Sequence, residues 1–165
     1  MRKFFVIVSM LLAANAATMA QQPSAAPSPV ENQEVRLALE KFFAAFSNLD
    51  WPAFRACFDD SATVFHPSAA HMRRTDSPSE FDTAWREVFD RIRKQSGRSK
   101  PPYMDLNPAD LNISVLAPGV ALVTFHLPGA EVFGRRTIVL KKFADGWKIV
   151  HIHASNFALS SPTAR

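Results

Sequence analysis

Three polar residues near the C-terminal end of the chain have the types and spacing that chemistry needs. His151, His153 and Ser155 alternate within one predicted strand, so their side chains are expected to share a face. Imidazole titrates near neutral pH and serves as acid, base or ligand contact. Trp147 and Ile149 have the same parity, so this face would be apolar at its start and polar towards its end, as in a pocket with a polar mouth. A β-bulge in the strand would reverse this assignment of faces.

The His-x-His pair has three interpretations. Both imidazoles can reach one metal ion, but a metal site needs a third or fourth ligand. His66 or His126 could add one, yet no carboxylate stands near them in a recognisable spacing, so we expect no metal. Buried histidines that bond to their neighbours are commoner. A ligand-contacting or acid–base role remains open.

Arg135, Arg136 and Thr137 begin the preceding strand. Alternation places Arg135 and Thr137 on one face and Arg136 on the other. One of the two arginines can then face the cleft and hold a carboxylate or phosphate through two hydrogen bonds; two solvated arginines are the alternative. Arg135 and Thr137 join the histidines as candidate ligand contacts.

The elements that must position these residues begin with helices. Apolar residues recur every three or four positions over 31–48, which predicts a helix with one buried face. Asp50 is expected to cap a short second helix, and Ser77-Pro78-Ser79-Glu80 is a capping box that opens a third over about 77–92. Trp85 lies on the apolar stripe of that third helix.

The apolar period then changes to that of strands. Strands are predicted at 62–66, 111–115, 120–127, 132–143 and 147–155, with Ala144-Asp145-Gly146 as a hairpin turn. The pattern indicates an α+β fold in which the helices cover one face of a curved antiparallel sheet. Ligands usually bind in the cleft that such a sheet leaves at its open end.

The ends of the chain and its composition restrict the class of protein. Arg2, Lys3, an apolar run and a small-x-small exit predict a signal peptide over residues 1–20, and hence a periplasmic or secreted protein with no membrane contact beyond export. Residues 21–30 are predicted to be a flexible linker, 31–157 the folded domain and 158–165 a tail.

Loss of the signal leaves 17 basic residues (19 − 2) and 15 acidic residues. A charge of 17 − 15 = +2 gives no support to nucleic-acid binding, and the single Cys excludes an internal disulfide framework.

Two C-terminal segments carry a resemblance to a known family. Gly134-Arg135-Arg136-Thr137-Ile138-Val139, followed by the segment 146–155, resembles the SnoaL-like branch of the nuclear-transport-factor-2-like superfamily, over about residues 31–157. The ending also looks like the association domain of calcium/calmodulin-dependent protein kinase II. The resemblance implies a cone-shaped α+β fold of the cystatin-like type, a pocket between sheet and helices, and homodimers.

The resemblance also implies one catalytic position. In the ketosteroid isomerases of this superfamily the general base is an Asp just after the first strand, and the matching segment here is His66-Pro67-Ser68-Ala69. His66 would then be the base. Those isomerases also use a Tyr and a protonated Asp as oxyanion donors. The only Tyr is Tyr103, in a proline-rich loop, and no residue matches the Asp, so steroid isomerisation is not supported.

Three functions remain open. The first is an exported protein that binds a small organic molecule, anionic if an Arg faces the cleft, without catalysis. The second is a cofactor-independent isomerase, cyclase or lyase with His66 as base and His151 or His153 as hydrogen-bond donor. The third is a dimerisation module with a vestigial pocket. No cofactor is expected, and the candidate contacts are His66, Trp85, Arg135, Thr137, His151, His153 and Ser155.

Overall fold

A computed structural model describes residues 29–67 and 73–159 of the chain. The predicted signal peptide and most of the predicted linker and tail lie outside the described residues. Within these two described ranges, three helices and five strands follow one another as α1 (Pro29–Asn48), α2 (Trp51–Ala56), β1 (Phe58–Phe65), α3 (Pro78–Ser96), β2 (Ala109–Ala117), β3 (Val120–Pro128), β4 (Val132–Phe143) and β5 (Gly146–Ala158).

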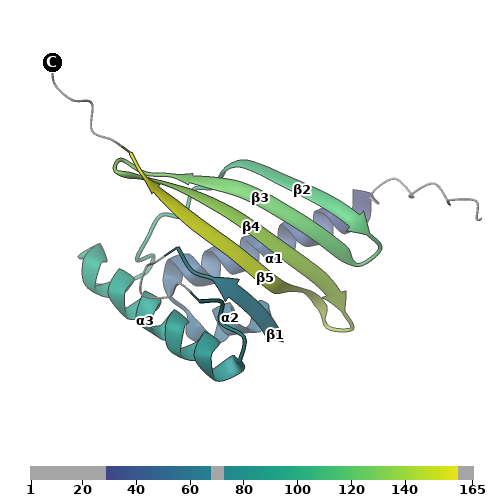
Figure 1. Cartoon of the computed structure of the whole chain (residues 1–165), viewed down its shortest axis with the longest axis horizontal. Helices are drawn as coiled ribbons and strands as arrows, with labels where there is room; N and C mark the ends of the chain where they lie inside the picture. The colour runs from purple at the N-terminus through teal and green to yellow at the C-terminus, as the bar shows by residue number, and fades with distance from the viewer. Residues whose placement is uncertain (1–28, 68–72, 160–165) are drawn as a thin grey trace, which may run out of the picture.

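The strands form one sheet in the order β1-β5-β4-β3-β2. Strands β2 to β5 form an antiparallel meander, because short turns join consecutive strands. The pairing of β1 with β5 is parallel, since the chain reaches β5 only after α3 and the whole meander. The sheet is therefore mixed, and the prediction of a purely antiparallel sheet is wrong at this one edge. Figure 1 shows the helices on a single side of the sheet.

The helix ends follow the capping chemistry expected of the sequence. The Asp50 carboxylate accepts a hydrogen bond from the backbone N–H of Ala53 at 3.1 Å and caps α2. The Ser77 hydroxyl accepts one from the N–H of Glu80 at 3.3 Å and caps α3. That helix continues to Ser96, beyond its predicted end, and stops at Gly97, which adopts a left-handed φ of 64°.

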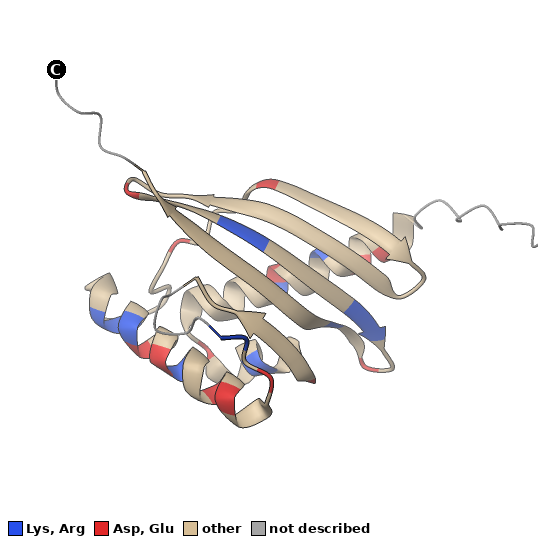
Figure 2. Ribbon diagram, in the orientation of Figure 1, with Lys and Arg blue, Asp and Glu red and all other residues tan. Residues whose placement is uncertain are grey.

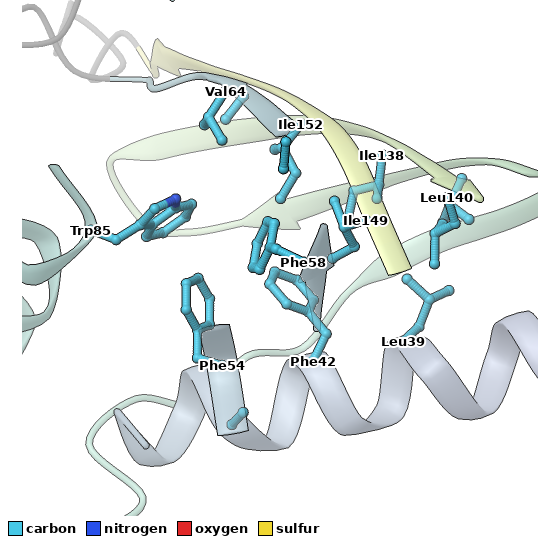
Figure 3. Close-up of a cluster of buried hydrophobic side chains, with 14 of the residues drawn as sticks. Leu39, Phe42, Phe54, Phe58, Val64, Trp85, Ile138, Leu140, Ile149 and Ile152 are labelled. Atoms are coloured by element: carbon cyan, nitrogen blue, oxygen red, sulfur yellow. The ribbon is translucent and has the colours of Figure 1, made fainter. Parts of the chain in front are cut away.

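The core lies between the helices and the inner face of the sheet, meaning the face that the helices cover (Figure 3). Phe54 of α2 has no exposed surface, and its ring lies 4.8 Å from the ring of Trp85 and 4.9 Å from that of Phe89. From the sheet, Ile138 and Ile149 are each 1% exposed. The sequence predicts four core residues, Trp85, Phe89, Trp147 and Ile149. The structure confirms Trp85, Phe89 and Ile149 as buried, whereas Trp147 is only partly buried against the core. No described helix is long and apolar enough to cross a membrane.

Candidate functional site

A β-bulge decides which face of the sheet the histidines occupy. Leu140 of β4 pairs with Ile149, but the next residue, Val139, pairs with His151, so Val150 is an extra residue in β5. An extra residue reverses the alternation that follows it. Ile149 and Ile152 are therefore both buried on the inner face, while His153 is exposed on the other. The prediction that His151, His153 and Ser155 share a face with Trp147 and Ile149 is wrong for this reason.

The histidines instead belong to a cluster on the outer face, the face without helices. The His151 Nδ1 atom lies 2.7 Å from the Thr63 hydroxyl oxygen, within hydrogen-bond distance. The ring of Phe65 lies 6.0 Å from that of His151 and 5.5 Å from that of His153. Burial, together with the charges of His153 and Arg74, lowers the pKa of His151 below its usual 6.5. We call Thr63, Phe65, His151 and His153 the outer histidine cluster.

The other predicted contacts of β4 and β5 share this outer face. Thr137 pairs with His153 and Arg135 with Ser155 across the two strands. The Arg135 guanidinium is exposed and lies over the ring of Phe157, 4.0 Å from its centroid. Figure 2 shows the arginines 135–136 and the lysines 141–142 as two separate basic stretches of β4. Five predicted contacts thus lie together, but away from the space between sheet and helices.

A small cavity lies on the inner face, between α1, α3 and the sheet. Its volume is about 40 Å³, and three polar side chains line it, those of His66, Trp85 and Arg136. The remaining lining residues are apolar, and they include Phe46, Phe125, Ile138 and Ile152. Apolar walls with a few convergent polar groups are typical of a ligand site.

Trp85 and His66 reach the cavity from α3 and from the end of β1. Each is 7% exposed, and their ring centroids lie 4.9 Å apart. Figure 3 shows the Trp85 indole extending from α3 towards the sheet, with its nitrogen turned to the side of Val64. The indole N–H is buried and donates to no acceptor among the described residues. A buried donor without an acceptor is costly, so this N–H can serve a ligand.

Arg136 brings a positive charge to the cavity. Its Nη1 donates to the backbone oxygens of Arg135 (2.8 Å) and Ser155 (3.0 Å), and its Nη2 donates to Oδ1 of Asn156 at 3.1 Å. All three acceptors are neutral, and no carboxylate of the described residues forms an ion pair with it. Burial lowers the pKa of Arg136. A partly buried cation held only by neutral groups favours an anion as its partner.

A second depression is larger and more open. It is an open groove of about 1260 Å³ between α1, α2 and the β4–β5 hairpin. Within it, Glu34 accepts hydrogen bonds from Lys142 (2.6 Å) and from the Trp147 indole (2.9 Å), and Lys148 pairs with Asp145. These side chains of the groove thus form hydrogen bonds and ion pairs with one another. Cys57 also lines this groove, but burial raises the pKa of its thiol, which argues against a reactive cysteine.

The histidines do not assemble a metal site in the described part of the chain. No group of three or more His, Cys, Asp and Glu side chains there could hold an ion. His126, considered above as a third ligand, is engaged elsewhere, with its Nδ1 atom 3.1 Å from a carboxylate oxygen of Asp110.

Of the seven predicted contacts, the structure brings only His66 and Trp85 to the inner cavity. The arginine beside them is Arg136 rather than Arg135. Parity alone leaves the choice between the two arginines open, because the register of β4 against the core decides which of them points inward. Ile138 and Leu140, both 1% exposed, share parity with Arg136 and would have identified it from the apolar pattern of the strand.

Comparison with known proteins identifies the fold. A SnoaL-like domain model matches residues 35–160. A candidate dehydratase of the nuclear-transport-factor-2-like family from Streptomyces avermitilis is 19% identical, with a TM-score of 0.63 over 79% of this chain and 98% of that one. The association domain of C. elegans calcium/calmodulin-dependent protein kinase II is 17% identical, with a TM-score of 0.58 over 76% of this chain and 95% of that one.

A third solved structure is a candidate ketosteroid isomerase from Parabacteroides distasonis, 18% identical, with a TM-score of 0.53 over 79% of this chain and 88% of that one. The search among curated proteins gave no match. At these identities the solved structures show a shared fold, on which relatives of different function are built. Because the domain model covers most of the chain, from α1 to the end of β5, the protein belongs to the SnoaL-like domain family.

Proposed function

We propose that this protein binds a small organic molecule through an anionic group, in the inner cavity at Arg136, Trp85 and His66. The observation that carries the proposal is the Arg136 guanidinium, which is partly buried and held by neutral acceptors only. The indole N–H of Trp85 lines the same cavity without an acceptor among the described residues. An anionic ligand would satisfy both groups at once.

The size of the cavity limits what it can enclose. Sites that bury a whole drug-sized ligand measure about 300–1,000 Å³, whereas this cavity measures about 40 Å³. We therefore expect it to hold the anionic head group, with the rest of the molecule extending along the apolar side chains of Leu106 and Leu127 on its wall.

Adjacent arginines on opposite faces of the sheet provide a matched test. Native mass spectrometry of the purified protein would detect a retained small molecule. We expect Arg136→Ala to lose it and Arg135→Ala to keep it, since only the first side chain lines the cavity. In affinity, the loss of a charged hydrogen-bond partner corresponds to about ten- to a hundredfold. Equal retention by both variants would contradict the proposed site.

Catalysis is the second candidate function. His66 is buried at the end of β1 beside Trp85, and two relatives of the same fold are named as a candidate dehydratase and a candidate ketosteroid isomerase. In this version His66 is the general base of a cofactor-independent isomerase, cyclase or lyase. The Trp85 N–H and Arg136 would replace His151 and His153 as donors to the developing oxyanion, because those histidines lie on the outer face.

Binding and catalysis differ in what happens to a bound molecule. If His66 is a base, incubation of the retained ligand with the protein converts it to product, and His66→Gln stops turnover while Arg136 still binds the ligand. If the protein only binds, the same change alters affinity and no product forms with either protein.

We also propose a homodimer that forms through the outer face of the sheet. No helix of the described chain covers this face, and apolar side chains such as Leu122 and Val139 lie on it half-buried. A related fold acts as an association domain. Sedimentation velocity should give a dimer for the protein and a monomer for Val139→Glu. Asp90→Lys, on the exposed side of α3, is the control that should stay dimeric.

Export completes the proposal. Residues 1–20 have the pattern of a signal peptide, so the working protein would start at Gln21 in the periplasm or outside the cell. N-terminal sequencing of the protein from the periplasmic fraction should begin at Gln21. A protein that keeps Met1 and stays with the cytoplasm would contradict this assignment.

A further inference from the structure

The Arg136 guanidinium lies close against Gly134. A Cβ atom built on Gly134 would lie 3.0 Å from Nη1 of Arg136, 3.2 Å from Nη2 and 3.2 Å from Oδ1 of Asn156. Contacts of 3.0–3.4 Å are tighter than nine in ten real Cβ contacts, so an alanine would require the guanidinium or the amide to shift by a few tenths of an ångström. Gly134 and Asn156 are also register partners across β4 and β5, which places the amide opposite the glycine.

The contacts of the guanidinium leave a defined part of it available. Arginine has five N–H donors, two on each Nη and one on Nε. The oxygens of Arg135 and Ser155 use both donors of Nη1, and Asn156 uses one donor of Nη2. The second Nη2 donor and the Nε donor have no acceptor among the described residues. Nε and Nη2 lie on one edge of the planar group, and two parallel donors on an edge match the two oxygens of a carboxylate.

The acceptors around Arg136 are neutral, so they do not offset the positive charge of its guanidinium. An amide oxygen orients the guanidinium without adding a negative charge, whereas an aspartate in the same place would neutralise it. Asn156 therefore fixes the direction of Arg136 and leaves its charge for a ligand. This is the arrangement that a binding site needs, because the donors are held in place before the ligand arrives.

We propose that Gly134 and Asn156 are positioning residues that present the Nε–Nη2 edge of Arg136 to a carboxylate. The inference rests on the proposed function and deepens it, since it names the ligand's anionic group and the residues that select it. Gly134 provides the space, Asn156 provides the neutral hydrogen bond, and neither is required to touch the ligand.

Acetate and its neutral counterpart acetamide are the probes that test this role. In ¹⁵N-edited NMR, acetate should shift the Arg136 Nε–H and the Trp85 indole N–H signals, and acetamide at equal concentration should not. We expect the acetate Kd to rise about two- to tenfold in Asn156→Ala and in Gly134→Ala, as the loss of one hydrogen bond predicts. Asn156→Asp should bind acetate more weakly than either. Phe157→Ala, at the exposed outer neighbour, is the control that should bind as the unchanged protein does.

The NMR signal of Arg136 distinguishes a positioning role of Asn156 from a general contribution to stability. In ligand-free Asn156→Ala we expect the Nε–H signal of Arg136 to broaden through faster solvent exchange and reorientation, while the backbone spectrum stays folded. If Gly134→Ala fails to fold, the two Asn156 variants decide the matter, since their side chain is exposed.

The outcomes distinguish a failure of the positioning role from a failure of the proposed binding site. If Arg136→Ala abolishes acetate binding while all Gly134 and Asn156 variants bind like the unchanged protein, the positioning role is overturned and the proposed site stands. If Arg136→Ala binds acetate normally, the proposed site itself is overturned. If acetate and acetamide act alike on the unchanged protein, recognition of a carboxylate is overturned.

Discussion

Arg135 and Arg136 are neighbours in one strand, yet their surroundings have little in common. Arg135 lies on the outer face over the ring of Phe157, exposed to solvent. Arg136 turns inward to a cavity, loses solvent, and is held by the two carbonyl oxygens and the amide oxygen described above. The two side chains carry the same guanidinium group, and the difference in burial decides which of them is suited to bind a ligand.

The same contrast separates the histidines. His66 is buried against Trp85 on the inner face, whereas His151 and His153 belong to the outer cluster, one of them bonded to Thr63 and the other exposed. If the outer face is a dimer interface, its histidines serve assembly and His66 serves the ligand. The following experiments test the contrast between the faces, from the largest expected effect to the smallest.

Removal of an aromatic ring should be costly on the inner face and nearly neutral on the outer one. Phe54→Ala empties a fully buried position and should lower the free energy of unfolding by about 3–5 kcal/mol. Phe157→Ala removes a side chain that is 47% exposed and should cost less than about 0.5 kcal/mol. Urea unfolding followed by tryptophan fluorescence measures both. Similar costs for the two variants would show that the Phe157 ring is buried in solution.

Replacement of the two arginines should affect stability differently. Arg136→Met removes a partly desolvated charge that lacks a charged partner among the described residues, so we expect the free energy of unfolding to rise by up to about 1 kcal/mol while anion binding is lost. Arg135→Met should change stability by less than about 0.5 kcal/mol. Urea unfolding of both variants provides the comparison. A clear loss of stability in Arg136→Met would mean that its hydrogen bonds hold the strands together and are not kept for a ligand.

The smallest effect is the pH dependence contributed by His151. Its pKa is lowered below 6.5 mainly by burial, so the folded state binds this proton less readily than the unfolded state does. The contribution of His151 to the free energy of unfolding is therefore fully present above about pH 6.5 and falls as the pH drops through the folded-state pKa. An NMR titration of the His151 ring should give a midpoint below 6.5, and His151→Gln should reduce the loss of stability on acidification. A midpoint at or above 6.5 would contradict the described environment of the outer histidine cluster.

Local chemistry made most of the fold predictable. The N-cap residues Asp50 and Ser77 act within one helical turn, so their sequence signal is complete in a few residues. The β4–β5 hairpin is equally local: its turn lies at 144–145, and Gly146 has a φ of 118°, a value that favours glycine. The strand predicted at 120–127 corresponds to β3, which pairs without interruption along β4.

The candidate site was less predictable because it depends on register. The periodicity of β5 gives no warning of the bulge at Val150, which arises where the strand must pair with β4 and with β1 at once. One extra residue moved His151, His153 and Ser155 to the outer face. His66 was predicted from the resemblance to the ketosteroid isomerases and Trp85 from the apolar stripe of its helix, and both line the inner cavity.

By itself the sequence determined the helices, their caps, the meander of strands and the family, since each depends on spacing within a short segment or on a contiguous motif. The tertiary structure alone decided which histidines leave the cavity and how closely Arg136 and Asn156 approach Gly134. The physical reason is that these features depend on contacts between segments far apart in the chain: the parallel pairing of β1 with β5, the bulge that accommodates it, and the approach of Asn156 to Gly134 across two strands.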